Sequence, residues 1–250
     1  LAGSRGMAGA AVLASEAAYR AGAGLVYLAC PEGLVDVLSI KQTCAVVRPL
    51  PERGAADRFL EYAATCDVAV IGPGLSTDPA VAEAVREVVV GLEIPFVLDA
   101  DGLNAFIDFP DLLQRGHAPR VLTPHPGEAA RLLKRSIGEI QADRPAAAKE
   151  LAERFLAVAV LKGHRTLISD GKRCTVNRSG NPGMATGGTG DVLSGVVAAL
   201  IGQHLTPYDA AVLGVHLHGR AGDRAAKRIG ETSLMATDVL AALPEVFKST

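Results

Sequence analysis

A glycine-rich loop that leads into an apolar helix is the most informative part of the sequence. It reads Asn181-Pro182-Gly183-Met184-Ala185-Thr186-Gly187-Gly188-Thr189-Gly190-Asp191-Val192-Leu193-Ser194-Gly195. Glycines let the backbone approach a ligand, and free N–H groups at a helix N-terminus point toward negative charge, assisted by the helix dipole. The stretch therefore predicts an anion site, for which phosphate is the natural ligand. It matches neither a Walker P-loop nor a G-x-G-x-x-G fingerprint after an early strand, so nucleotide use requires another fold.

Asp191 begins the helix predicted after this loop, and its residue type supports two interpretations. A carboxylate at this position is favoured as a helix cap and by the helix dipole, and for an isolated Asp capping is at least as common as catalysis. The preceding Gly-Gly-Thr-Gly places Asp191 beside a site for a transferring phosphoryl group, where it can accept a proton from a substrate hydroxyl. Both interpretations stay open on the residues alone.

Outward from the loop, short apolar runs alternate with longer stretches of helical period, the pattern of an α/β protein with a mainly parallel sheet. Strands are expected at Leu25–Cys30, Val68–Gly72, Phe96–Asp99, Arg120–Thr123, Ala157–Lys162, Thr166–Ser169 and Arg173–Val176, the last two forming a hairpin. Helices are expected at Gly9–Ala21, Pro79–Val90, Pro126–Leu133, Arg144–Phe155, Gly190–Gly202 and Pro207–Arg228. Open α/β sheets build their sites at the carboxyl ends of the strands, so functional residues are expected in the loops that follow them.

Two of these loops combine small residues with acids. Gly72-Pro73-Gly74 ends a strand and offers either a flat surface for a ring or phosphate, or an ordinary turn. Asp99, Asp101 and Asn104 follow the next strand, where acids can position a magnesium-bound phosphate through water or cap the following helix. For Asp101 the two roles are equally supported.

The next two loops contain a histidine and a lysine. His125 lies between two prolines, which stiffens its backbone and predicts a fixed ring direction. Glu128 is expected to begin a helix, and an indirect link to magnesium is its alternative role. Lys162 ends an apolar strand, where a charged side chain is unfavourable unless its ammonium group contacts an anion or solvent.

Composition limits the partners. The chain has 250 residues, 49% hydrophobic and 21% charged, with a net charge of −2; these values predict one globular domain over residues 1–250 and no nucleic-acid partner, while leaving room for a small basic pocket. No apolar run approaches the ~20 residues of a membrane span, so a cytoplasmic protein without membrane contact is expected. Leu1-Ala2-Gly3-Ser4 looks like the end of a strand that enters a glycine loop, so an upstream strand or a whole additional domain is expected.

The loop Gly188-Thr189-Gly190-Asp191 resembles the anion-hole signature of the ribokinase-like superfamily. Further stretches, in order and approximate spacing over nearly the whole chain, resemble one branch of it, the NAD(P)H-hydrate dehydratases. They are Ala2-Gly3-Ser4, Gly6 to Ala10, Gly22 to Val26, Ile71 to Leu75, Leu98 to Asn104, Leu122 to Glu128, Leu161-Lys162-Gly163 and Asn181 to Gly195.

The resemblance implies a ribokinase-like three-layer α/β sandwich with a mainly parallel central sheet flanked by helices. It also implies site residues. Ala10, Gly74, His125 and Asp191 are expected to contact the hydrate substrate, with Asp191 as the base. Adenine-nucleotide contacts are expected from Lys162, Gly163, His164, Arg165, Thr166, Gly187, Gly188, Thr189 and Gly190.

The implied reaction is the nucleotide-dependent dehydration of (S)-NADHX or NADPHX to NADH or NADPH, by phosphorylation of the ring hydroxyl and elimination of phosphate. ADP or ATP is the expected co-substrate and Mg²⁺ the expected cofactor, with metal ligands unassigned. A homotetramer and a functional link to an NAD(P)HX epimerase are also expected. Two alternatives remain: a kinase of the same superfamily acting on a vitamin precursor, and a nucleotide-binding regulatory protein without catalysis, against which the presence of Asp191 argues.

Overall fold

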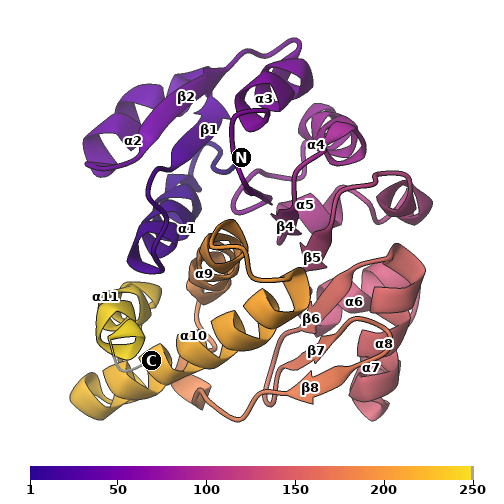
Figure 1. Ribbon diagram of the computed structural model, residues 1–250, viewed down its shortest axis with the longest axis vertical. Helices are drawn as coiled ribbons and strands as arrows, with labels where there is room; N and C mark the ends of the chain where they lie inside the picture. The colour runs from indigo at the N-terminus through magenta and orange to yellow at the C-terminus, as the bar shows by residue number, and fades with distance from the viewer. Residues whose placement is uncertain (249–250) are drawn as a thin grey trace.

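The alternation of apolar runs and helical stretches produces a six-stranded sheet with strand order β3-β4-β5-β6-β7-β8 (Figure 1). The computed structural model describes residues 1–248. The strands are β3 (Ala69–Ile71), β4 (Phe96–Leu98), β5 (Arg120–Leu122), β6 (Val158–Leu161), β7 (Leu167–Ser169) and β8 (Cys174–Val176). Strands β3 to β6 are parallel, and β7 and β8 continue the sheet as the expected antiparallel hairpin. The prediction of a mainly parallel α/β protein is therefore confirmed.

Alternate residues of the strands face two separate cores, which makes the molecule three-layered. Phe96 and Leu98 pack into one core, and Val97 packs into the other, because successive side chains of a strand point to opposite faces. The first core is covered by α3 (Ala55–Ala63), α4 (Pro79–Gly91), α5 (Asp101–Asn104), α6 (Pro126–Leu133), α7 (Ile137–Ala142) and α8 (Arg144–Phe155). The second is covered by α1 (Ala8–Arg20), α9 (Thr189–Gly202), α10 (Pro207–Ile229) and α11 (Ala236–Phe247).

Small residues bring α1 and α9 into close contact. A Cβ atom at Gly195 would overlap the carbonyl oxygen of Ala14, and it would lie 3.0 Å from the Cβ of Ala17. The two helices can therefore pack backbone against backbone. This packing fixes the position of α9, which carries the glycine-rich loop at its N-terminus.

A second, two-stranded parallel sheet contains β1 (Tyr27–Pro31) and β2 (Val46–Leu50), next to α2 (Val35–Lys41). The strand expected at Leu25–Cys30 thus begins two residues later. Strand β2 was not predicted, because Arg48 and Pro49 interrupt its apolar run. The guanidinium of Arg48 stacks instead on the rings of Tyr27, at 4.7 Å, and Tyr62, at 5.3 Å.

Four helices longer than α5 were also not predicted, namely α2, α3, α7 and α11. Helix α11 contains Pro244 in its interior. Three short 3₁₀ segments complete the described part of the chain, at Glu32–Leu34, Pro110–Gln114 and Pro182–Met184. Across residues 1–248, no helix combines the length and the apolar character needed to cross a bilayer.

Candidate active site

The N-terminus of α9 lies over the carboxyl ends of the central strands. A Cβ atom at Gly190 would stand 3.3 Å from Lys162 Nζ, at the end of β6, and 3.6 Å from Asp99 Oδ2, at the end of β4. Residues that are far apart in the sequence therefore meet under the glycine-rich loop, at the edge of the sheet where the site was expected.

A buried ion pair forms the floor of this region. Lys162 Nζ donates to Asp99 Oδ1 at 2.6 Å, and Ser194 Oγ donates to Asp99 Oδ2 at 2.7 Å. Burial alone would raise the pKa of Asp99, but the charge of Lys162 and the hydrogen bonds from Lys162 and Ser194 hold it below its ordinary value. Burial likewise opposes the charge of Lys162, and the carboxylates of Asp99 and Glu128 raise its pKa despite that burial. Both members of the pair are therefore ionised.

His125 and Glu128 form a capping box at the start of α6. The backbone N–H groups of Gly127 and Glu128 donate to His125 Nδ1 at 3.0 and 3.3 Å, and the backbone N–H of His125 donates to Glu128 Oε2 at 2.7 Å. Because Nδ1 accepts, the proton of the neutral ring is on Nε2. The half-exposed ring, 51% accessible, is thus held in one direction, which gives a structural cause for the fixed direction inferred from the prolines.

Glu128 extends this unit toward the ion pair. Its side chain is buried, with Oε2 3.9 Å from Lys162 Nζ. Burial raises the pKa of Glu128, and the nearby charge of Asp99 adds to this effect while Lys162 opposes it. Lys162 therefore lies between two carboxylates, and the capping box is coupled electrostatically to the floor of the site.

Asp191 occupies the third position of α9 and does not cap it. Gly188 is the N-cap residue, and within residues 1–248 no side chain caps this helix. Burial and the nearby charge of Asp99 raise the pKa of Asp191 to about 7, with Lys162 opposing the shift. A carboxyl group with this pKa can accept a proton near neutral pH. The structure therefore does not support the capping interpretation, and the role of Asp191 as a base stays a prediction.

The turn after β3 brings two predicted substrate contacts together. Gly74 has a φ of 62°, and a Cβ atom there would lie 2.9 Å from the Cβ of Ala10 and 2.8 Å from the carbonyl oxygen of Met7. At Gly72, an added Cβ would overlap the carbonyl oxygen of Asp99. These glycines are required for close approach of the chain segments, so the turn is more than an ordinary reversal.

Asp101 holds this turn rather than a helix end. Its Oδ2 accepts from the backbone N–H of Ser76 at 2.9 Å, and its Oδ1 accepts from Asn104 Nδ2 at 3.1 Å. Between Asp99 and Asp101, Ala100 has a φ of 47° and a ψ of −120°, a conformation that costs a non-glycine residue about 1–3 kcal/mol. The strained Ala100 lies in the loop that orients Asp99 and Asp101, and nothing in the sequence predicted its backbone conformation.

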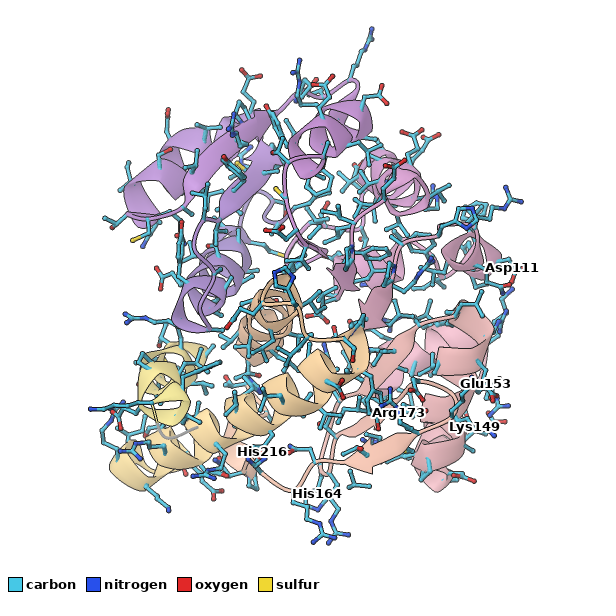
Figure 2. All side chains as sticks on the ribbon, viewed as in Figure 1. Asp111, Lys149, Glu153, His164, Arg173 and His216 are labelled. Atoms are coloured by element: carbon cyan, nitrogen blue, oxygen red, sulfur yellow. The ribbon has the colours of Figure 1, made fainter. Side chains whose placement is uncertain are left out.

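The predicted nucleotide segment, residues 162–166, is divided by the fold. The ammonium of Lys162 turns inward to Asp99, whereas His164 and Arg165 are exposed on the loop before β7. Figure 2 shows His164 at the margin of the molecule. His164 and Arg165 line an open pocket of about 560 Å³ together with residues 176–180, which include Arg178. Arg178 was not predicted as a site residue, because a single arginine after a strand has no distinguishing pattern.

His218 is a second residue that the sequence did not connect with the site. Its side chain is buried in α10 and hydrogen-bonds the backbone of Thr189, and burial lowers its pKa to about 4. Its Nε2 has no hydrogen-bond partner among the described residues. His216 is exposed instead, so the two histidines face different directions.

The acids of the site do not form a ready-made metal centre. In the part of the chain that the structure describes, no group of three or more His, Cys, Asp or Glu side chains is arranged to hold a metal ion. Asp99 is already paired with Lys162. The arrangement fits a hard cation held mainly by the phosphates of a nucleotide, with water between the cation and the protein carboxylates.

Comparisons with known proteins agree with this geometry. The sequence profile of the NAD(P)H-hydrate dehydratase family matches residues 1–245. The bifunctional NAD(P)H-hydrate repair enzyme Nnr of Moorella thermoacetica is 48% identical over 99% of this chain and 48% of its own length. The ADP-dependent (S)-NAD(P)H-hydrate dehydratase of Neisseria meningitidis is 40% identical over 88% of this chain and 74% of its own length. The chain thus spans about half the length of the bifunctional relatives that it matches.

A solved structure supports the same assignment. The ADP/ATP-dependent NAD(P)H-hydrate dehydratase of Bacillus subtilis, co-crystallised with ATP and Mg²⁺ and soaked with CoA, superposes with a TM-score of 0.84. It is 31% identical, and the match covers 99% of this chain and 89% of the Bacillus chain. The expected ribokinase-like sandwich is confirmed, and the chain belongs to the NAD(P)H-hydrate dehydratase family.

Proposed function

We propose that this chain restores NADH and NADPH from their (S)-hydrates, (S)-NADHX and (S)-NADPHX, in a reaction that consumes ADP or ATP. The observation that carries the proposal is the position of Asp191. Its half-buried carboxyl group, with a pKa of about 7, follows directly on the glycine-rich loop at the N-terminus of α9. A base beside a phosphate-binding helix terminus is what phosphorylation of a hydroxyl requires.

The proposed reaction has two steps, phosphoryl transfer to the ring hydroxyl and elimination of phosphate. Asp191 takes the proton of the ring hydroxyl while the hydroxyl oxygen bonds to the terminal phosphorus of the nucleotide, whose bond to the bridging oxygen breaks. The ring C–O bond then breaks and inorganic phosphate leaves with the bonding electrons. A proton lost from the adjacent ring carbon restores the double bond. Phosphorylation thus converts a poor leaving group into a good one.

The glycine-rich loop stabilises the group in transfer. Backbone N–H groups of Gly187, Gly188, Thr189 and Gly190 face the transferred phosphoryl group, assisted by the dipole of α9. Thr189 Oγ1 donates to the carbonyl oxygens of Met184, at 2.9 Å, and Thr186, at 3.0 Å, and these bonds hold the loop in shape. Lys162, through Asp99 and Ser194, holds the first turn of α9 above the sheet.

The hydrate and the nucleotide approach from two sides. Ala10, Gly74 and the fixed ring of His125 contact the hydrate. The nucleotide lies along residues 162–166, with the pocket of His164 and Arg165 accepting its outer part. Asp101 and Glu128 would hold Mg²⁺ indirectly beside the nucleotide phosphates, and the bound ion would supply charge neutralisation.

The direct test mixes purified protein with NADHX and either ADP or ATP and follows the recovery of reduced-nicotinamide absorbance. Asp191→Asn is expected to abolish recovery. Asp209→Asn is the matched control, because Asp209 also occupies the third position of a helix but is exposed on α10. No recovery with either nucleotide contradicts the proposal, and a product that keeps its phosphate identifies a small-molecule kinase instead.

We also propose the setting in which this activity operates. Bifunctional relatives about twice as long as this chain support coupling to an epimerase that interconverts the hydrate forms. A cytoplasmic homotetramer is the assembly expected from the family. Light scattering of the purified protein tests the tetramer, since a monomer would contradict it.

A further inference from the structure

The segment from Ser179 to Thr189 lies between β8 and α9 and packs closely against α10. A Cβ atom at Gly219 of α10 would overlap Ser179, and a Cβ atom at Gly222 would overlap the side chain of Met184. Both glycines are inside a helix, where glycine is destabilising relative to alanine. The close approach of this segment to α10 gives a structural reason for glycine at both positions.

Asp223 of α10 fixes the beginning of this segment. Its Oδ2 accepts from the backbone N–H of Gly180 at 2.9 Å, and its Oδ1 accepts from Asn181 Nδ2 at 3.1 Å. Hydrogen bonds to a carboxylate are stronger than those between neutral groups. Each oxygen of the half-buried Asp223 carboxylate therefore holds one N–H donor of the segment.

Asn181 connects this carboxylate to the glycine-rich loop. While its amide nitrogen donates to Asp223, its Oδ1 accepts from the backbone N–H of Gly183 at 3.1 Å and caps the 3₁₀ turn that ends at Met184. The carbonyl oxygen of Met184 then accepts from Thr189 Oγ1 at 2.9 Å. A chain of hydrogen bonds thus leads from Asp223 to the first residue of α9.

The same segment forms part of the open pocket that contains His164 and Arg165. Ser179 and Gly180 line this pocket, and the backbone N–H of Gly180 is the group that Asp223 holds. One carboxylate on α10 therefore supports two surfaces, which are a wall of the open pocket and the glycine-rich loop. In the proposed function, these surfaces accept the outer part and the terminal phosphate of one nucleotide.

We propose that Asp223 is a positioning residue for the nucleotide, because it fixes the pocket wall and the glycine-rich loop relative to each other so that both contact one nucleotide at the same time. The inference rests on the proposed function, which makes an adenine nucleotide the ligand of both surfaces. A segment that is already ordered loses less conformational entropy when a ligand binds. The Asp223 carboxylate therefore strengthens nucleotide binding through Gly180 and Asn181, without contacting the nucleotide.

The first test measures the binding of ADP and of ATP by titration calorimetry, without the hydrate. Asp223→Ala removes both hydrogen bonds, so we expect the dissociation constant of each nucleotide to rise at least about tenfold. Asp223→Asn has the same shape and keeps one acceptor oxygen, so it should recover part of this loss. Asp67→Ala is the matched control, since it makes the same substitution at an exposed residue before β3, and it should bind both nucleotides as wild type does.

Hydrogen exchange without any ligand measures the order of the segment directly. The amides of Met184 and Ala185 donate to backbone carbonyls within the 3₁₀ turn. Exchange at both amides should be at least about tenfold faster in Asp223→Ala than in Asp67→Ala. In steady-state kinetics, the KM for the nucleotide should rise in Asp223→Ala while the KM for the hydrate stays at the wild-type value, a split that general destabilisation of the fold does not produce.

Wild-type dissociation constants for ADP and ATP in Asp223→Ala would overturn the proposal even if the melting temperature falls, because Asp223 would then have only a structural role. Equal exchange at Met184 and Ala185 in the two alanine variants would also overturn it. Failure of the proposed function gives a different result. A wild-type protein that binds ADP or ATP but restores no NADH contradicts the reaction, and calorimetry of the variants still decides the role of Asp223.

Discussion

Replacing Asp191 with Asn should remove the activity and make the protein more stable at pH 8. Burial and the charge of Asp99 raise the pKa of this carboxyl group from 3.8 to about 7. An acid with a raised pKa in the folded state is harder to ionise there than in the unfolded chain. The folded protein thus loses stability as the pH rises from about 4 to about 7, and the loss is complete above pH 7. A neutral Asn does not carry this cost.

The size of the effect follows from the two pKa values. A difference of about three corresponds to about 4 kcal/mol, and partial exposure of the carboxylate to water reduces the expected gain to about 2–4 kcal/mol. In urea unfolding at pH 8, this moves the midpoint upward by roughly 1 M. The gain should shrink at pH 5, where the wild-type carboxyl group is mostly protonated in the folded state. Turnover should fall by at least about 10²-fold, the contribution of a general base.

The refuting results are specific. An Asp191→Asn protein that is less stable than wild type at pH 8 would show that the ionised Asp191 carboxylate does not destabilise the folded protein. A gain that is the same at pH 5 and pH 8 would show that ionisation is not its cause. Asp209→Asn serves as the control for introducing Asn near a helix N-terminus. Its turnover should match wild type and its stability at pH 8 should not rise, because Asp209 Oδ2 accepts from Thr206 Oγ1 at the start of α10.

Three further substitutions test other parts of the site. Lys162→Met leaves Asp99 buried without its counter-charge, so unfolding at pH 7 should become easier by about 3–5 kcal/mol; unchanged stability would mean that the ion pair contributes nothing. Gly74→Ala should cost about 1–2 kcal/mol in thermal unfolding and raise KM for the hydrate, because φ is 62° and the new methyl group meets Ala10; an unaltered KM would separate the turn from the substrate. His218 stays neutral with a pKa of about 4, against 6.5 ordinarily, so only the unfolded chain gains a proton as the pH falls through this window. His218→Leu should therefore remove about 3 kcal/mol of stability loss between pH 7 and pH 4; parallel stability curves for the two proteins would be inconsistent with this account.

The elements that could be predicted share a strong local signal. The central strands are continuous apolar runs because both faces are buried. Helices α4, α6 and α10 begin with a proline after the capping residue, and α8 has Pro145 at its second position. Strand β2 lacks such a signal, because its Pro49 is tolerated only through its place in a small, partly exposed sheet. Helix α11 tolerates Pro244 because the helix is held by packing in the core of α9 and α10.

The sequence by itself determined the α/β architecture, the glycine-rich loop at residues 187–190 before a helix and the acid that follows it, because glycines before an apolar helix have a local physical meaning. Only the tertiary structure decided what these residues do to one another. Asp191 gains a pKa near neutrality from burial and from Asp99, which is 92 positions away in the chain. Lys162, predicted from the sequence as a nucleotide contact, is also the partner of a buried carboxylate. Long-range electrostatics and burial depend on distances that strand order creates, and no local pattern encodes them.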